Sequence, residues 1–213
     1  MAIDMADEAT ILRGTEERDG PAESALLALL NGRHIVLVGL MGAGKTSVGK
    51  RLAQRLHLPF VDSDNAIEES ANMTIPEIFK LRGEAEFRSG ERRVIARLLG
   101  EPQQVIATGG GAYMDAETRL RIRERGIAVW LKAELPVLMR RVQRRHDRPL
   151  LANADPEATM RDLMAKRYPV YAEADLCILS DEQPHEAMVT RVIDALSAHL
   201  EPASDRPSRD RPA

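Results

Sequence analysis

A glycine-rich segment with a lysine at a fixed spacing constrains this chain more than any other part of its sequence. Residues 39–46 read Gly-Leu-Met-Gly-Ala-Gly-Lys-Thr and match the pattern G-x-x-x-x-G-K-[ST]. An apolar run at 35–38 precedes the segment, and Val48, Leu52 and Leu56 follow it at intervals of four residues, as on one face of a helix. This strand–turn–helix context predicts a loop that binds the phosphates of a nucleoside triphosphate, rather than a plain glycine-rich turn.

The residue types in this loop suit phosphate binding chemically. Glycines let backbone N–H groups approach phosphate oxygens closely, because no Cβ stands in the way. The N-terminus of the following helix adds unpaired N–H donors and a favourable dipole. Lys45 is expected to reach the β- and γ-phosphates, and the Thr46 hydroxyl is expected to ligate Mg²⁺. These features leave the acceptor of the phosphoryl group open.

Short apolar runs alternate with helix-period segments along the rest of the chain. The apolar runs fall at 35–38, 60–61, 105–107, 127–131 and 176–179. The helical stretches fall at about 84–99, 116–125, 135–145, 156–167 and 185–200. Another helix is predicted to open at Thr74-Ile75-Pro76-Glu77, a capping box with a proline in its first turn. The alternation predicts an α/β fold, in which helices cover both faces of a parallel sheet.

The two ends differ in composition from the segment between them. Residues 1–22 are polar and are predicted to be flexible, whereas the leucine-rich segment 22–30 is predicted to form a short docking helix. Residues 201–213 combine Pro, Ser, Arg and Asp without apolar anchors, which predicts a disordered tail. We therefore expect an N-terminal extension at 1–32, one domain at 33–200 and a tail at 201–213.

Composition favours a soluble, cytoplasmic, monomeric protein. Lys and Arg total 30 against 33 Asp and Glu, and this net charge of −3 gives no reason to expect nucleic acid or a membrane as a partner. The acidic N-terminus resembles neither a secretory signal nor a transit peptide. The one cysteine, Cys177, cannot form an internal disulfide, and it is predicted to be buried within the apolar run 176–179.

Two carboxylates follow the second predicted strand. Asp62-Ser63-Asp64 comes directly after Pro59-Phe60-Val61, and ligands of open α/β sheets bind at the carboxyl ends of the strands. One carboxylate is predicted to hold Mg²⁺ through its water shell, and the other to accept a hydrogen bond from the acceptor hydroxyl. The alternative is a polar turn in which Asp64 caps a helix that starts near Asn65.

A second glycine turn, Thr108-Gly109-Gly110-Gly111, follows the apolar run 105–107. Successive glycines at a strand end permit close approach of a small ligand and offer N–H donors to it, although a plain tight loop has the same composition. This strand lacks the terminal aspartate that holds magnesium in many P-loop proteins. Asp62 is therefore the expected magnesium carboxylate.

Arginines occur where an anionic acceptor would need them. Arg88 lies one turn before Glu91, and Arg167 lies in Lys166-Arg167-Tyr168-Pro169. Guanidinium groups bind carboxylates in a bidentate manner, although most arginines on helices of this kind are solvated surface charges. The charged segment 144–151 contains Arg148 and interrupts the helical periodicity, which predicts a mobile lid at about 143–156.

Taken together, these segments resemble the shikimate kinase family over about residues 35–196. The segments that carry the resemblance are 39–46, 62–64, Gly83-Glu84, Phe87-Arg88, Glu91, 109–111, 148–151, 167–169 and Tyr171. The resemblance implies a three-layer P-loop kinase fold with a five-stranded parallel sheet and a lid. It also implies transfer of the γ-phosphoryl group of ATP to the 3-hydroxyl group of shikimate, with one Mg²⁺ ion as cofactor.

The resemblance further implies roles for individual residues. Asp64, Lys45 and Arg148 would be catalytic, with Asp64 as general base and Arg148 closing from the lid. Residues implied to contact shikimate are Asp64, Arg88, Gly110, Gly111, Arg167, Phe79, Phe87 and Glu91. Residues implied to contact ATP are Gly42, Ala43, Gly44, Lys45, Thr46, Ser47, Arg141, Arg148 and Pro184. Mg²⁺ would bind Thr46 directly and Asp62 through water.

Two other functions stay open on the sequence alone. A gluconate-type small-molecule kinase uses the same scaffold, and its acceptor also carries a carboxylate and hydroxyl groups. The glycine turn and Arg148-Pro149-Leu150-Leu151 favour shikimate over that acceptor. A non-catalytic ATP-binding module would have no physical need for the set Asp64, Arg88, Arg148 and Arg167.

Overall fold

The computed structural model describes residues 20–143 and 155–201 and shows one five-stranded sheet whose strands all run parallel. The strands are β1 (His34–Val38), β2 (Phe60–Asp62), β3 (Val105–Ala107), β4 (Gly126–Lys132) and β5 (Leu176–Leu179). Their order is β2-β3-β1-β4-β5, so the chain builds to one side of β1 and then to the other. Such a change of direction places a ligand crevice at the carboxyl ends of the strands. The predicted α/β fold is confirmed.

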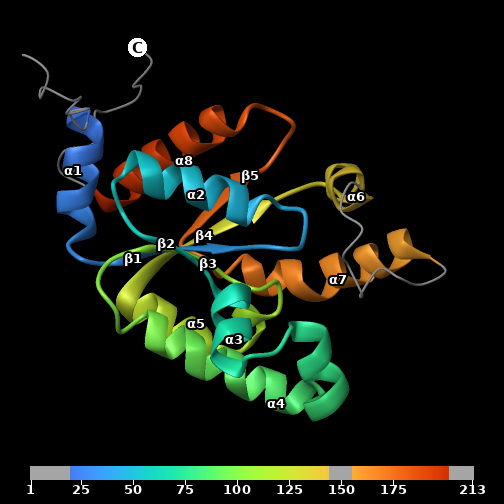
Figure 1. Cartoon of the computed structure of the whole chain (residues 1–213). Coiled ribbons are helices and arrows are strands. Elements are labelled where there is room, and N and C mark those ends of the chain that lie inside the picture. Colours follow the sequence, from blue (N-terminus) through green and yellow to red (C-terminus); the bar gives the residue numbers. More distant parts are fainter. Residues whose placement is uncertain (1–19, 144–154, 202–213) are drawn as a thin grey trace, which may run out of the picture.

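Helices cover both faces of the sheet (Figure 1). On one side lie α1 (Pro21–Leu30), α2 (Lys45–Arg55) and α8 (His185–Leu200), and on the other lie α4 (Ile75–Leu98) and α5 (Ala116–Arg125). The remaining elements are α3 (Ser63–Ala71), the 3₁₀ turn η1 (Ala112–Met114), α6 (Leu135–Gln143) and α7 (Pro156–Tyr171). Because both faces are covered, every residue of the central strand β1 is buried.

Helix α4 begins at a capping box and is interrupted once. Thr74 Oγ1 accepts a hydrogen bond from the Glu77 N–H, and Glu77 Oε2 accepts one from the Thr74 N–H, which confirms the predicted helix start. Gly83 has a φ of 80° and a ψ of 171°, a backbone conformation that residues with a Cβ disfavour, so the helix kinks there. The second part of α4 buries Phe87 and Glu91.

Helix α1 packs on α8, and its apolar side chains join the core that covers this face of the sheet. Leu26 and Leu30 are fully buried. Glu23 forms an ion pair with Arg55 of α2, with 2.8 Å between Oε1 and Nε. The hydrogen bond from Arg55 lowers the pKa of Glu23. These contacts join α1 to both α2 and α8.

The prediction that Cys177 is buried is wrong. β5 pairs only with β4 and is therefore an edge strand, and Ile178 is its one buried residue. Cys177 is exposed. The apolar composition of 176–179 suggested burial on both faces, but α8 packs against one face of β5 and alternate side chains point away from it.

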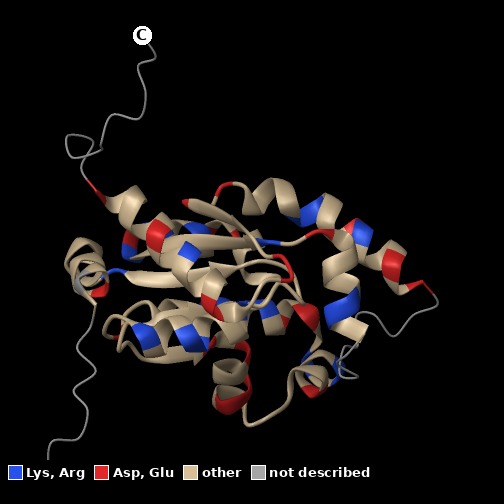
Figure 2. Ribbon diagram, turned by 90° about the horizontal axis from the view of Figure 1, so that it is seen from above, with Lys and Arg blue, Asp and Glu red and all other residues tan. Residues whose placement is uncertain are grey.

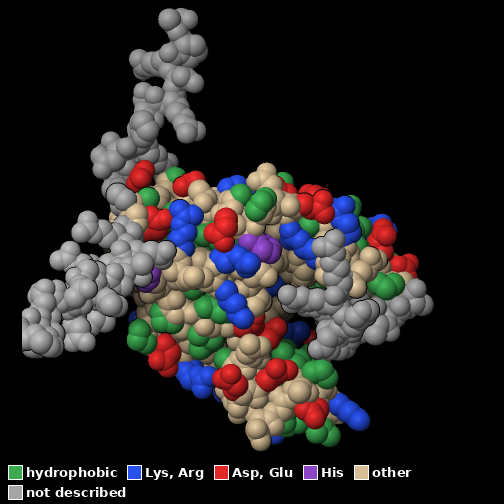
Figure 3. Space-filling model, turned by 45° about the horizontal axis from the view of Figure 1, so that its top comes forward, with side chains coloured by type: hydrophobic (Ala, Val, Ile, Leu, Met, Phe, Trp, Pro, Cys, Tyr) green, Lys and Arg blue, Asp and Glu red, His purple; other side chains and the backbone are tan. Residues whose placement is uncertain are grey.

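Charged residues of both signs are spread over the helices (Figure 2). The face seen in Figure 3 shows them interspersed rather than gathered into one patch of a single sign. This distribution agrees with the small net charge of −3. Within 20–143 and 155–201, no helix combines the length and the apolar character that crossing a membrane requires.

Candidate active site

The glycine-rich segment 39–46 connects the end of β1 to the start of α2, as predicted. Gly44 caps α2 with a φ of 96°, and Gly42 has a φ of 80°. A Cβ on Gly42 would lie 3.0 Å from Val142 Cγ2 and 3.2 Å from the carbonyl oxygen of Leu138, both in α6. Gly39 has a φ of 142°, and a Cβ there would lie 2.8 Å from the carbonyl oxygen of Leu131. All three glycines of this loop are therefore required for their backbone conformation, and two of them also for the close approach of neighbouring atoms.

Lys45 is the first residue of α2 and lies across the loop. Its Nζ donates hydrogen bonds to the carbonyl oxygens of Gly39, at 2.8 Å, and Leu40, at 3.0 Å. The ammonium group is thus held beside the N-terminus of α2, where the unpaired N–H groups of the helix also favour an anion. This combination of donors and positive charge suits the phosphates of a nucleotide.

Arg141 of α6 supports the same loop from the side of β5. Its guanidinium donates to the Gly42 carbonyl oxygen at 3.2 Å, to Ser180 Oγ at 2.9 Å and to the Asp181 carbonyl oxygen. Ser180 Oγ in turn donates to the carbonyl oxygen of Ala43 at 2.8 Å. Ser180 was not predicted as a site residue, although its position directly after an apolar run placed it at the ligand-binding end of the sheet.

Thr46 and Asp62 meet between α2 and the end of β2. Thr46 Oγ1 donates to Asp62 Oδ2 at 2.8 Å. Asp62 Oδ1 accepts a hydrogen bond from the Asp64 N–H at 3.1 Å, which makes Asp62 the N-cap of α3. The alternative in which Asp64 caps this helix is therefore wrong, because α3 starts at Ser63 and Asp64 lies inside its first turn.

Asp64 lies against the second glycine turn. A Cβ on Gly109 would lie only 2.5 Å from Asp64 Oδ1 and 3.0 Å from Glu91 Oε1, so both carboxylates approach the backbone where a larger residue would exclude them. Ser63 Oγ accepts a hydrogen bond from the Gly109 N–H at 2.9 Å and fixes α3 to the turn. No role was predicted for Ser63 from the sequence.

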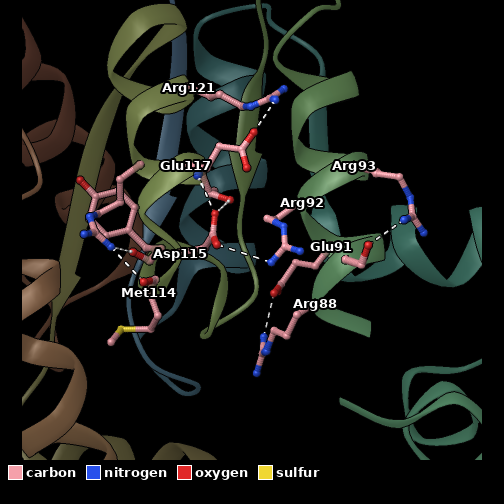
Figure 4. Close-up of polar contacts among 12 residues, drawn as sticks. Arg88, Glu91, Arg92, Arg93, Met114, Asp115, Glu117 and Arg121 are labelled. Carbon is pink, nitrogen blue, oxygen red and sulfur yellow. Dashed lines mark hydrogen bonds and ion pairs between the residues drawn. The ribbon is translucent and has the colours of Figure 1, made fainter. Parts of the chain in front are cut away.

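Two arginines converge on the next two glycines of the turn. Arg88 Nη1 donates to Glu91 Oε2 at 2.7 Å, and Figure 4 shows the two side chains pointing toward one another from α4. A Cβ on Gly111 would lie 2.4 Å from Arg88 Nη1. Arg167 of α7 donates from Nη1 to the Gly110 carbonyl oxygen at 2.9 Å. The two guanidinium groups therefore face one turn from different helices.

Glu91 is the carboxylate that holds Arg88. Its side chain is only 3% exposed, so burial raises the pKa of Glu91, against the opposing effect of the ion pair with Arg88. Because an ion pair with a buried carboxylate restricts an arginine side chain, Glu91 limits the positions that the half-buried Arg88 guanidinium can adopt. Arg88 Nη2 also donates to the exposed Glu84 Oε1, at the longer distance of 3.4 Å, so an incoming anion would compete with this weaker contact rather than with the one to Glu91.

Two phenylalanines form an apolar wall next to Arg88. The rings of Phe79 and Phe87 lie 4.6 Å apart between centroids, and the Arg88 Cζ lies 5.1 Å from the centre of the Phe87 ring. Phe87 is buried, whereas Phe79 is 37% exposed. An acceptor bound by Arg88 would have apolar ring surface beside it.

The structure thus brings the predicted phosphate, magnesium and acceptor residues to the carboxyl end of one sheet. Pro184 lies at the same end as the N-cap of α8 and is exposed. Arg148 lies outside the described residues, as does most of the predicted lid at about 143–156; only residues 143, 155 and 156 of that range are described. Figure 1 shows α6 and α7, which flank that segment in the sequence, at the end of the sheet where the phosphate loop lies.

The fold and this arrangement of residues define a P-loop phosphotransferase. The profile of the shikimate kinase family matches residues 41–197. The chain belongs to the shikimate kinase family and is an ATP-dependent kinase that phosphorylates a hydroxyl group of shikimate.

Individual relatives agree with this assignment. The chain is 53% identical over 196 residues to the shikimate kinase of Bradyrhizobium diazoefficiens, and this match covers 92% of each protein. It is 54% identical over 187 residues to that of Rhodopseudomonas palustris, covering 88% of this chain and 92% of the relative. Among solved structures, the shikimate complex of the Acinetobacter baumannii shikimate kinase has a TM-score of 0.77 and 37% identity, covering 81% of this chain and 97% of that one.

A gluconokinase structure from Sinorhizobium meliloti also resembles this chain, with a TM-score of 0.51, 19% identity, and coverage of 79% of this chain and 91% of that one. At that identity the likeness concerns the fold alone. The shared scaffold explains why the phosphate loop could not by itself distinguish the two acceptors.

Proposed function

We propose that the protein transfers the γ-phosphoryl group of ATP specifically to the 3-hydroxyl group of shikimate, through the residues gathered at the glycine turn 109–111. The observation that carries the proposal is the convergence of Arg88 and Arg167 on one turn beside Asp64. Shikimate offers one carboxylate and several hydroxyl groups on a six-membered ring. Two guanidinium groups suit the carboxylate, and Asp64 suits a hydroxyl.

In this proposal the acceptor lies between α3, α4 and α7. Arg88 and Arg167 bind its carboxylate, the N–H groups of Gly110 and Gly111 and the carboxylate of Glu91 face its polar groups, and the phenylalanine wall contacts its ring. Asp64 accepts a hydrogen bond from the 3-hydroxyl group. Binding the two ends of the acceptor from separate elements fixes the reacting hydroxyl relative to the phosphate loop.

In the proposed transfer step, the 3-hydroxyl oxygen forms a bond to the γ-phosphorus of ATP. The bond from that phosphorus to the β–γ bridging oxygen breaks, and ADP leaves with the electron pair. The hydroxyl proton passes to Asp64. Lys45, held beside the loop, offsets the negative charge on the transferring group. We assign Arg148 the same task from the lid, and Arg141 and Pro184 the contacts with the adenine.

The pair Thr46 and Asp62 fits a magnesium ion. Both offer oxygen donors, which Mg²⁺ prefers, and the ion commonly keeps several water molecules when few protein ligands are present. No group of three or more His, Cys, Asp or Glu side chains suited to a metal occurs in the described ranges. We propose that Thr46, directly, and Asp62, through water, would hold one Mg²⁺ ion, which would neutralise negative charge on the nucleotide phosphates.

The carboxylate assignment predicts a specific kinetic change. Arg88→Lys and Arg167→Lys should each raise KM for shikimate by about tenfold or more and change kcat less, because lysine retains the charge but cannot make the forked contact. Steady-state kinetics with saturating ATP measure both constants. Arg121→Lys is the matched control, since Arg121 is an exposed residue of α5 that pairs with Glu117 on the same helix. An unchanged KM in both site variants would contradict the assignment.

We also propose a monomeric, cytoplasmic enzyme. Among the residues that the structure describes, the exposed large apolar side chains are divided among α4, α5 and β5 rather than gathered on one face; they are Phe79, Leu81, Leu120 and Leu179. Cys177 is an exposed free thiol and the one cysteine of the chain, which suits a reducing compartment. Balanced surface charge supports small molecules, rather than nucleic acid or an anionic membrane, as partners.

A further inference from the structure

The Gly110 carbonyl oxygen accepts two hydrogen bonds from α7. One comes from Arg167 Nη1, at 2.9 Å, and the other comes from the hydroxyl of Tyr171. Arg167 and Tyr171 are four residues apart, so their side chains lie on the same face of the helix. The arginine proposed to bind the acceptor and this tyrosine therefore share one anchor on the glycine turn.

Tyr171 is held rigidly in the core. Its side chain is 1% exposed, and its ring lies 5.9 Å from the Trp130 ring and 6.4 Å from the Tyr113 ring. Burial raises the pKa of Tyr171 to about 12, so its hydroxyl stays protonated at neutral pH and can donate to a carbonyl. Close packing leaves the hydroxyl little freedom to point elsewhere.

Holding this carbonyl also orients the next N–H group. The peptide unit between Gly110 and Gly111 is planar and trans, so the Gly111 N–H points opposite to the Gly110 carbonyl. Neither the Gly110 N–H nor the Gly111 N–H donates a hydrogen bond to any residue that the structure describes. The carbonyl is thus fixed on the α7 side, while the neighbouring donors remain available for a ligand.

A glycine turn needs such an external restraint. Without a Cβ, glycine adopts many backbone conformations at little energetic difference, so three successive glycines do not fix their own peptide planes. Gly109 is restrained by Ser63 on one side of the turn, and the Gly110 carbonyl is restrained by α7. The restraint from α7 is the one that orients the Gly111 N–H, which is proposed to bind the phosphoryl acceptor.

We propose that Tyr171 is a positioning residue for acceptor binding, which fixes both the glycine turn and the Arg167 guanidinium through the carbonyl oxygen that they share. This inference rests on the proposed function, because it assumes that Arg167 and the turn bind the acceptor. Tyr171 itself touches neither substrate. Its hydroxyl acts on the affinity for the acceptor and leaves the nucleotide side of the site unaffected.

Tyr171→Phe tests the proposal, because it removes one oxygen atom and retains the packed ring. Gly110 keeps its hydrogen bond from Arg167, so no buried carbonyl is left without a donor and folding is retained. KM for shikimate should rise by about three- to tenfold, the range that corresponds to loss of one hydrogen bond. KM for ATP and kcat should stay within about twofold of the wild-type values.

Tyr168→Phe is the matched control. Tyr168 lies on the same helix, packs edge-on against Trp130 at 4.9 Å, and donates its hydroxyl to a different carbonyl, that of Ala133. A purely structural role for buried tyrosine hydroxyls of α7 would affect both variants alike. A rise in KM for shikimate confined to Tyr171→Phe supports the proposal, and equal KM values in the two variants would overturn it. A wild-type enzyme that does not use shikimate would instead overturn the proposed function, and this inference with it.

Discussion

Asp64→Asn is expected to lower kcat with shikimate by about 10²- to 10⁴-fold, the range that general-base catalysis contributes. Asparagine has nearly the same shape and can still contact the acceptor, but it cannot take up the hydroxyl proton. Asp64 lies where the Gly109 backbone leaves room for a carboxylate, so the substitution should fit without displacing the turn. Steady-state release of ADP at saturating ATP and shikimate measures kcat directly.

The control for this substitution is Asp194→Asn, which removes one negative charge from an exposed position of α8. Its kcat should stay within about twofold of wild type, because surface charges distant from the site contribute little. A kcat for Asp64→Asn that matches this control would show that Asp64 does not take part in proton transfer. A higher KM with unchanged kcat would reduce its role to binding.

Removal of magnesium is expected to abolish turnover. Excess EDTA should reduce ADP release to the background rate, and added Mg²⁺ should restore it, because the phosphate charge would otherwise repel the attacking oxygen. Asp62→Asn should raise the Mg²⁺ concentration for half-maximal activity by about 10- to 100-fold, the usual effect of losing a residue that orients a metal site. Titration of ADP release with Mg²⁺ measures this concentration.

This substitution separates metal binding from helix stability. Asp62 also caps α3 by accepting the Asp64 N–H, and asparagine is an equally good N-cap, so α3 should stay intact. Activity of the variant should therefore recover at high Mg²⁺ concentration. A variant with the wild-type Mg²⁺ requirement would contradict the proposed role of Asp62.

Local patterns predicted the fold because each strand and its following helix are encoded by consecutive residues. The alternation of apolar runs and helix-period stretches gave the parallel sheet, and Thr74 with Glu77 marked a helix start that the structure confirms. The order of the strands depends on contacts between distant segments, and it was not predicted from the sequence. The burial of Cys177 was predicted wrongly for the same reason, since composition does not reveal that β5 lies at an edge.

Some residues of the candidate site could likewise be predicted from the sequence, and others could not. Asp62, Asp64 and the glycine turn could be placed from sequence, because the carboxyl ends of parallel strands meet at one edge of the sheet. The supporting residues Ser63, Ser180 and Tyr171 act through hydrogen bonds to backbone groups 46 to 137 residues away. No local pattern encodes such contacts, so only the folded chain reveals them.

The choice of acceptor tests the proposed pocket most directly, because Arg88, Arg167 and Asp64 are proposed to bind the groups that shikimate carries. Purified protein with Mg²⁺ and ATP should release ADP rapidly when shikimate is added, and should remain at background when gluconate replaces it. This result would support binding of a ring carboxylate by Arg88 and Arg167 beside Asp64. Rapid turnover with gluconate and none with shikimate would leave the phosphate loop assigned and contradict the acceptor site.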